Sequence, residues 1–299
     1  MQLARTFAVL MMLPACTVSA AKREQPAVPH CPAHATVMDG WDDRAPPRKL
    51  FGNTWYVGSC GLTALLVTSP AGHVVIDGAS EAAGPLIAAN IRALGFKPQD
   101  VKYIVNSHEH RDHAGGIAYL QRITGAVVRV RAPALATFQS GHGDRSDPQF
   151  LDGSTVFPPV ANTAVVADGE TIRVGSQLAL TAHATPGHAA GGTSWTWRSC
   201  AGKHCLNIAY TDSSSAISDN DFQYSAHPAY VAAFEHGLDT IAALPCDIQI
   251  APHPLAVNLF ARMQGRAPLI DANACKTYAA NGRIALAARL QQEQAGAKP

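Results

Sequence analysis

A cluster of metal-binding side chains follows a short apolar run in the first half of the chain. The run is Val101–Val105, and His108, His110, Asp112 and His113 come shortly after it. Imidazole nitrogen and carboxylate oxygen are common protein ligands of zinc. In extended chain, residues two apart point the same way and lie about 6.6 Å apart, so His108 and His110 can converge on one ion. The spacing therefore predicts a metal at the end of a strand.

Two more histidines occupy turns that follow expected strands. The turn T-P-G-H at residues 185–188 ends in His188, and the turn P-H-P at residues 252–254 carries His253. In layered α/β proteins, sites assemble at strand ends from loops that are distant in sequence. We therefore expect His188 and His253 to be additional ligands, although spacing alone does not assign each ligand to a particular ion.

Strands and helices alternate along the part of the chain that must position these side chains. Residues 86–94 and 230–241 repeat apolar side chains at helical spacing. Short apolar runs between turn residues predict strands. These runs lie at residues 54–57, 62–68, 73–77, 101–105, 126–130, 163–167, 171–174, 178–183, 193–197, 206–210 and 247–251. Strands mixed with helices over the whole length predict an α/β layered domain.

The composition is that of an ordinary globular protein. The chain has 299 residues, of which 47% are hydrophobic and 15% charged, and its formal net charge is +1, which argues against a nucleic-acid partner. We expect one domain at residues 51–299, preceded by an irregular arm at residues 22–50. The loop at residues 140–162 is rich in Gly, Pro and Asp and long enough to border a pocket.

The first 21 residues are typical of a secretory signal peptide. Arg5 precedes an apolar run at residues 7–14, and small residues follow it. This pattern predicts export to the periplasm without a membrane span. Lipid attachment at Cys16 is the less favoured alternative, because Pro14 is an awkward residue before a lipidated cysteine.

Six cysteines remain after the expected signal peptide, an even number for an oxidising compartment. Their proximity in sequence favours three disulfides: Cys31 with Cys60, Cys200 with Cys205, and Cys246 with Cys275. A second zinc site made by Cys200, His204 and Cys205 is the alternative. We favour the disulfides, because exported thiols usually oxidise.

The motifs H-x-H-x-D-H, T-P-G-H and P-H-P, in this order and spacing, resemble those of the metallo-β-lactamase superfamily over residues 50–256. This resemblance implies a four-layer αβ/βα sandwich. Residues 52–58, 191–200 and 210–213 are similar to the third subclass, B3, and most similar to the Adelaide imipenemase type. The implied activity is zinc-dependent hydrolysis of the β-lactam amide in penicillins, cephalosporins and carbapenems, which confers antibiotic resistance. We expect a monomer whose partner is the small-molecule β-lactam.

The resemblance also implies two Zn²⁺ per chain and a role for each site residue. The first zinc would be held by His108, His110 and His188, and the second by Asp112, His113 and His253. Ser213 stands where the first subclass has a cysteine ligand, so His113 completes the second site instead. Ser213 and Ser215 resemble the hydroxyls that hold the substrate carboxylate. Asp112 is the expected catalytic residue, which would orient the nucleophile and help to move a proton to the leaving nitrogen.

Two other functions fit the same residues less well. A thioesterase like glyoxalase II, or a lactonase, would keep the fold and the zinc, but its aspartate bridges both metals and Asp212 lies one position away from that place. A zinc-stabilised binding protein is the other alternative. Structural zinc sites are usually closed by four ligands, whereas three ligands for each metal leave a position open for water. The residues therefore favour the lactamase.

Overall fold

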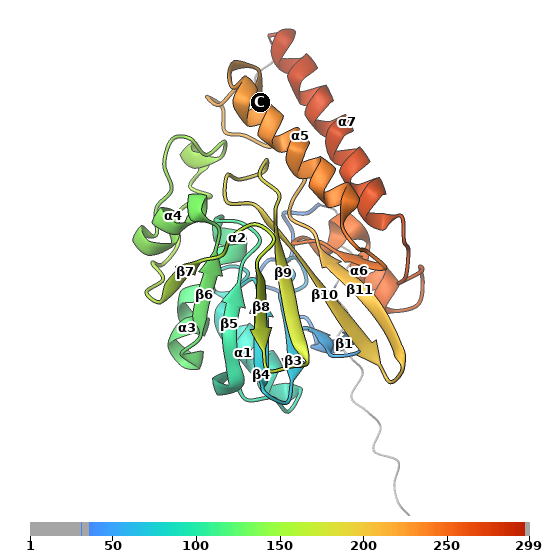
Figure 1. Cartoon of the computed structure of the whole chain (residues 1–299). Helices are drawn as coiled ribbons and strands as arrows, with labels where there is room; N and C mark the ends of the chain where they lie inside the picture. Colours follow the sequence, from blue (N-terminus) through green and yellow to red (C-terminus); the bar gives the residue numbers. More distant parts are fainter. Residues whose placement is uncertain (1–30, 32–35, 297–299) are drawn as a thin grey trace, which may run out of the picture.

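Two β-sheets stacked face to face form the centre of the computed structural model, which describes residue 31 and residues 36–296 (Figure 1). The first sheet contains, in spatial order, β1 (Arg48–Phe51), β2 (Thr54–Tyr56), β3 (Leu65–Ser69), β4 (Gly72–Ile76), β5 (Val101–Val105), β6 (Val127–Val130) and β7 (Thr163–Val165). The second contains β12 (Ile248–Ile250), β11 (His204–Tyr210), β10 (Thr193–Ala201), β9 (Leu178–Ala184) and β8 (Thr171–Val174). Both sheets are mixed, with parallel pairs from β4 to β7 and between β11 and β12.

Helices cover the outer faces of the two sheets. They are α1 (Ala83–Ala93), α2 (Arg111–Ala114), α3 (Ile117–Thr124), α4 (Leu135–Ser140), α5 (Pro228–Ala243), α6 (Leu259–Met263) and α7 (Ala274–Gln294). Helices α1 and α3 pack on the first sheet, while α5 lies on the side of the second sheet and packs along α7 (Figure 1). This order of layers confirms the expected αβ/βα sandwich.

The central strands are hydrophobic on both faces because each face meets a different layer. In β3, Leu65 and Val67 face the core between the sheets, and Leu66 faces the helices. Strand β4 repeats this alternation with Val74 and Val75. Side chains alternate between the two faces of a strand, so strands covered on both sides read as continuous apolar runs.

The differences between the fold and the sequence predictions include the N-terminal arm, the start of β3, and the helices outside residues 86–94 and 230–241, of which α7 is the longest. The N-terminal arm is not irregular throughout, because Arg48–Phe51 forms β1 and pairs with β2. Strand β3 begins at Leu65 and not at residue 62, because the backbone N–H of Ser59 bonds the carbonyl of Leu62 in a turn. Helix α7 was not predicted. Its alanines and scattered polar residues form no clear apolar stripe, so the sequence pattern does not predict this helix. Its packing against α5 is seen only in the structure.

The three disulfides pair the cysteines as the sequence predicts. Cys31 bonds Cys60, Cys200 bonds Cys205, and Cys246 bonds Cys275. Cys200 and Cys205 face each other across the β10–β11 hairpin. A second zinc site there is therefore wrong, because both thiols are consumed. The expected signal peptide at residues 1–21, with Cys16, lies outside the described residues.

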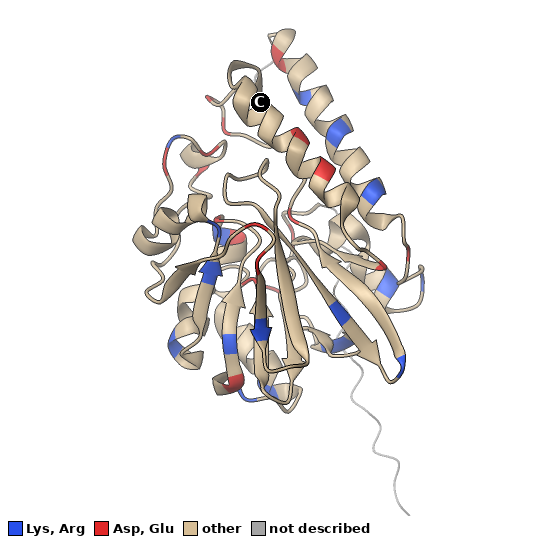
Figure 2. Ribbon diagram, in the orientation of Figure 1, with Lys and Arg blue, Asp and Glu red and all other residues tan. Residues whose placement is uncertain are grey.

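The charged side chains are dispersed over the molecule. Figure 2 shows Lys and Arg placed singly on several helices and strands, whereas a number of Asp and Glu lie in loops at the strand ends. Within residues 36–296, no helix is both long and apolar enough to cross a membrane. The buried aspartates include Asp77, Asp147 and Asp212 in loops and Asp112 in α2. Buried carboxylates need partners, and these aspartates mark the place where the site is found.

Glu293, near the end of α7, fixes the segment that precedes α5. Its carboxylate accepts hydrogen bonds from the backbone N–H groups of Tyr224 (3.0 Å) and Ser225 (2.7 Å) and from Nε of Arg289 (2.7 Å). Burial opposes ionisation of this carboxyl, but the hydrogen bonds outweigh it and hold the pKa of Glu293 below its usual value.

We expect Glu293→Ala to lower the free energy of unfolding of the metal-free protein by about 2 kcal/mol at neutral pH, since two N–H groups lose a charged acceptor. Because the pKa is depressed in the folded state, this contribution is complete above the unfolded value of about 4.3. It is lost as the pH falls through the lower folded value. Urea unfolding of wild type and variant should therefore show a smaller difference at about pH 3 than at about pH 7. An equal difference at both would contradict the assignment.

Candidate metal centre

The loop after β5 carries His108 and His110 and is held on both sides. The side chain of Asp77 accepts the backbone N–H of Ser107 (2.7 Å), and the indole N–H of Trp195 donates to the carbonyl of Asn106 (3.0 Å). These bonds tie the loop to the end of β4 in the first sheet and to β10 in the second. The two imidazoles therefore project from a backbone that both sheets hold in place.

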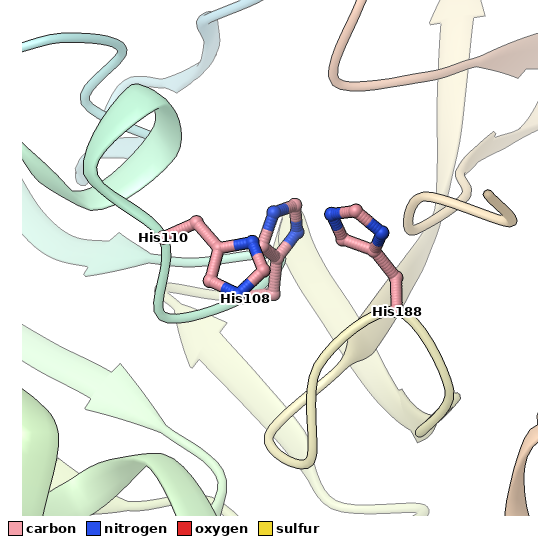
Figure 3. Close-up of side chains that lie close together, drawn as sticks. All are labelled: His108, His110 and His188. Atoms are coloured by element: carbon pink, nitrogen blue, oxygen red, sulfur yellow. The ribbon is translucent and has the colours of Figure 1, made fainter. Parts of the chain in front are cut away.

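Three imidazoles from two loops point toward one another. His108 and His110 come from the loop after β5, and His188 comes from the loop between β9 and β10 (Figure 3). The ring centroids are 4.8 Å apart for His108 and His110, 4.7 Å for His108 and His188, and 4.9 Å for His110 and His188. One nitrogen from each ring lies within 4.8 Å of the others. We call these residues the three-histidine set.

A second group adjoins the three-histidine set. Oδ2 of Asp112 lies 3.1 Å from Nε2 of His113 and 3.2 Å from Nε2 of His253. The rings of His113 and His253 are 5.0 Å apart. His108 is close enough to Asp112 and His113 to be grouped with them as well. The structure thus brings all six sequence-predicted ligands together, from three loops and the short helix α2.

Hydrogen-bond partners behind the rings orient the three-histidine set. Nδ1 of His108 lies 2.8 Å from Oδ1 of Asp212, and Nε2 of His110 lies 3.1 Å from Oδ2 of Asp147. Nδ1 of His188 lies 3.0 Å from the carbonyl oxygen of Ser215. A ligating histidine usually bonds a carboxylate or carbonyl through its other nitrogen. Each ring therefore turns its remaining nitrogen toward the other rings.

Buried nitrogens with few or no protein partners show that the group fits a cation. Nε2 of His108 is buried without a hydrogen-bond partner, and the buried Nε2 of His113 has only the Asp112 carboxylate at 3.1 Å. Leaving buried polar atoms unpaired is costly, and imidazole nitrogens with a carboxylate match the donor set of zinc. The residues present therefore fit the metal that the motif predicts.

The electrostatics keep His108, His188 and Asp112 in their metal-binding protonation states, whereas the effect of burial on His110 is outweighed by Asp147, which raises the pKa of that ring. Burial lowers the pKa of His188 to about 3 and that of His108 well below its usual range. Burial opposes ionisation of Asp112, but His113 and His253 outweigh it and hold its pKa well below the usual value. Metal binding needs neutral imidazole and ionised carboxylate. These groups are therefore ready to bind a cation at neutral pH.

Glu109 lies between two ligands in sequence but faces away from them. Its Oε1 accepts the backbone N–H of Gly191 (2.8 Å) in the loop that carries His188. A Cβ at Gly191 would lie 2.4 Å from Oε2 of Glu109, and one at Gly192 would lie 2.5 Å from Oδ2 of Asp212. The glycine pair therefore leaves room for two buried carboxylates, a signal that the sequence analysis did not use.

A cavity of about 550 Å³ opens over the histidines, a size typical of small-molecule sites. Its lining includes Trp41, Gln149, Ile217 and Tyr278, none of which the sequence analysis selected for the site. Gln149 belongs to the loop at residues 140–162, which borders the cavity as the sequence predicts.

Both serines of the substrate-binding prediction also line the cavity. Ser213 is 7% exposed, and the hydroxyl of Ser215 lies 3.1 Å from Nδ1 of His188. A hydroxyl that accepts this N–H keeps its own proton to donate. Both positions are therefore compatible with an anionic group in the cavity.

Comparisons with known proteins agree with this geometry. A family model described as the metallo-beta-lactamase superfamily matches residues 57–200. The structure is similar to metallo-beta-lactamase MIM-1 from Novosphingobium pentaromativorans, with 47% identity, a TM-score of 0.84, and coverage of 87% of this chain and 95% of that one. It is also similar to MEM-A1, a subclass B3 metallo-beta-lactamase from a soil metagenome library, with 44% identity, a TM-score of 0.82, and coverage of 86% and 99%.

A curated relative has a different activity in its name. The N-acyl homoserine lactonase AttM of Agrobacterium fabrum is 34% identical over 165 residues, which cover 44% of this chain and 58% of the lactonase. The chain thus matches less than two thirds of that relative's length, whereas the similarity to MIM-1 extends over nearly all of the solved structure. Together with the six converging side chains, this similarity shows that the chain belongs to the metallo-beta-lactamase superfamily.

Proposed function

We propose that the protein is a subclass B3 metallo-β-lactamase that hydrolyses the amide bond of β-lactams with two zinc ions. The observation that supports this most is the meeting of all six candidate ligands under one open cavity. Relatives that cover most of the chain are β-lactamases. The proposal includes similarity to the Adelaide imipenemase type. It also includes activity on penicillins, cephalosporins and carbapenems.

In the proposed hydrolysis, the residues around the cavity have separate roles. Zinc, when bound, would polarise the scissile carbonyl and lower the pKa of water toward about 7. Asp112 is ionised, and its Oδ2 faces His113 and His253, so its Oδ1 is the atom proposed to orient the attacking water and to pass a proton to the leaving nitrogen. Ser213 and Ser215 donate hydroxyl hydrogens to the substrate carboxylate.

Chelator-sensitive hydrolysis of imipenem tests the proposal. We expect purified protein to contain about two zinc ions per chain, to open the β-lactam ring, to lose activity with a chelator and to regain it with added zinc. Turnover that survives complete removal of metal would rule the proposal out, as would zinc-loaded protein without turnover of any β-lactam.

Lactone hydrolysis is the second candidate, because the curated relative is a lactonase. The position of Asp212 argues against the metal-bridging aspartate of such enzymes. Its Oδ1 bonds Nδ1 of His108, on the side of the ring that faces away from the other histidines. Parallel assays with imipenem and an N-acyl homoserine lactone distinguish the two: a higher kcat/KM for the lactone would favour the alternative.

We also propose that the protein is periplasmic. The support is the N-terminal sequence pattern together with three disulfides, which persist in oxidising compartments. Detection of the mature chain, without its first residues, in a periplasmic extract tests this proposal. A chain that stays in the membrane fraction with a lipid on Cys16 would support the alternative.

Ser213→Ala should raise KM for carboxylate-bearing β-lactams more than it lowers kcat, because the lost hydroxyl holds a part of the substrate that does not react. A loss of about tenfold in kcat/KM corresponds to one hydrogen bond to a charged group. Steady-state kinetics of wild type and variant measure the split. Identical kinetics would mean that the Ser213 hydroxyl serves only the scaffold.

A further inference from the structure

Asp219 joins the two loops that border the cavity. We call residues 141–153 the first loop and residues 211–222 the second loop. The side chain of Asp219 is 3% exposed. Its carboxylate accepts the backbone N–H groups of Leu151 (2.9 Å), Asp221 (2.9 Å) and Phe222 (3.0 Å) and Nη1 of Arg145 (3.0 Å), and its own N–H donates to the carbonyl of Pro148 (2.7 Å). Asp219 thus bonds both loops at once.

Within residues 36–296, every hydrogen bond between these two loops has Asp219 at one end. The remaining polar contact between them is an ion pair from Arg145 to Asp221, at 3.6 Å. Hydrogen bonds to an ionised acceptor are about twice as strong as neutral ones. Burial favours the neutral acid, but the backbone N–H groups outweigh it and hold the pKa of Asp219 below its usual value. Apart from the backbone bond between Asp219 and Pro148, the attachment of the first loop to the second therefore depends on one carboxylate.

Each loop contributes a group that holds a candidate ligand. In the first loop, Asp147 bonds Nε2 of His110. In the second loop, both the carbonyl and the hydroxyl of Ser215 face Nδ1 of His188. Asp219 itself is not among the residues that line the cavity, and none of its hydrogen bonds or ion pairs in the described part of the chain reaches a histidine. Its influence on the site can therefore act only through the two loops.

We propose that Asp219 is a positioning residue, which fixes the first loop against the second so that Asp147 reaches His110. The role at the metal rests on the proposed function, whereas the attachment of the loops can be measured without metal or substrate. The bonds that attach the two loops involve none of the residues proposed to bind substrate or move a proton. The proposal therefore has two readouts that can be separated.

Hydrogen exchange of the metal-free protein tests the attachment. In Asp219→Ala, we expect the amides of the first loop to exchange about tenfold faster, because the charged acceptor of Leu151 and the anchor of Arg145 are lost. Trypsin should also cut faster after Arg145. The matched control is Asp221→Ala, whose side chain is 67% exposed and contacts only Arg145 by an ion pair. Unchanged exchange in Asp219→Ala would overturn the proposal.

The cobalt(II) spectrum and the zinc affinity test the effect on the ligands. We expect Asp219→Ala to change the visible cobalt absorption and to weaken zinc binding about tenfold, the usual effect of disturbing groups behind a ligand. Asp219→Asn, which retains one acceptor oxygen, should restore part of both. The variant Ile91→Val, in the buried core between the first sheet and its helices, controls for a general loss of stability and should leave the spectrum unchanged.

The outcomes separate this proposal from the proposed function. Faster exchange in the first loop with an unchanged cobalt spectrum and zinc affinity would overturn the positioning role. A wild-type protein that binds no zinc would overturn the proposed function instead, and the exchange experiment would still decide whether Asp219 attaches the loops.

Discussion

His188→Ala is expected to lose zinc from the three-histidine set and to lower kcat/KM for imipenem by about 1000-fold. The ring of His188 lies 4.7 Å from that of His108 and 4.9 Å from that of His110, centroid to centroid, so alanine at this position removes one of the three nitrogens that face one another. Lewis-acid stabilisation by a metal is worth several kcal/mol, and about 4 kcal/mol corresponds to a factor of about 1000.

The matched control for this variant is His183→Ala. His183 lies in β9, a few residues before His188, and its Nε2 bonds the hydroxyl of Thr196 (2.8 Å) away from the cavity. We expect this control to keep its zinc content and nearly all of its activity. Metal analysis and steady-state kinetics of both variants, with circular dichroism to verify the fold, measure the result. Unchanged zinc content in His188→Ala would contradict the ligand assignment.

The local parts of the site could be read from the sequence because they depend on neighbouring residues. Val101–Val105 is a strand with the predicted bounds, and the turn after it places His108 and His110 at its end. His188 and His253 follow strands in the same way. The ends of strands that share an edge of a sheet meet in space. Sequence reasoning therefore found the residues that lie directly after strands.

The groups that support the ligands could not be predicted, because they come from distant loops. Asp212 reaches His108 across a sequence separation of 104 residues, and Asp147 reaches His110 across 37. No local pattern marks either aspartate. The cavity lining shows the same limit, since Tyr278 belongs to α7, a helix without a clear apolar stripe. The pair Gly191 and Gly192 was the one available signal, because a glycine pair beside a ligand turn suggests a close approach by other groups.

Asp77 connects the two sheets beneath the metal centre. It follows β4, and its Oδ1 accepts the backbone N–H of Ser107 (2.7 Å), which follows β5 in the first sheet. Its Oδ2 accepts the hydroxyls of Ser107 (2.7 Å) and of Tyr210 (2.6 Å), which ends β11 in the second sheet. Oδ2 also lies 3.8 Å from Nδ1 of His113. The carboxylate is fully buried, and burial raises the pKa of Asp77.

Asp77→Ala should lower the free energy of unfolding of the metal-free protein by about 4 kcal/mol, because several buried donors lose their acceptor at once. Alanine also fits poorly at the φ of 61° that Asp77 adopts. For a chain of this size the expected fall in Tm is about 10 °C.

Asp77→Asn, which keeps the side-chain shape and one acceptor oxygen, should lose about half as much. Asp100→Ala, at an exposed aspartate in the same half of the molecule, should change stability by less than about 0.5 kcal/mol. Thermal unfolding of the three variants and wild type tests this order. If Asp77→Ala unfolded at the wild-type temperature, water would have to replace the carboxylate at every donor, and the link between the sheets would not depend on Asp77.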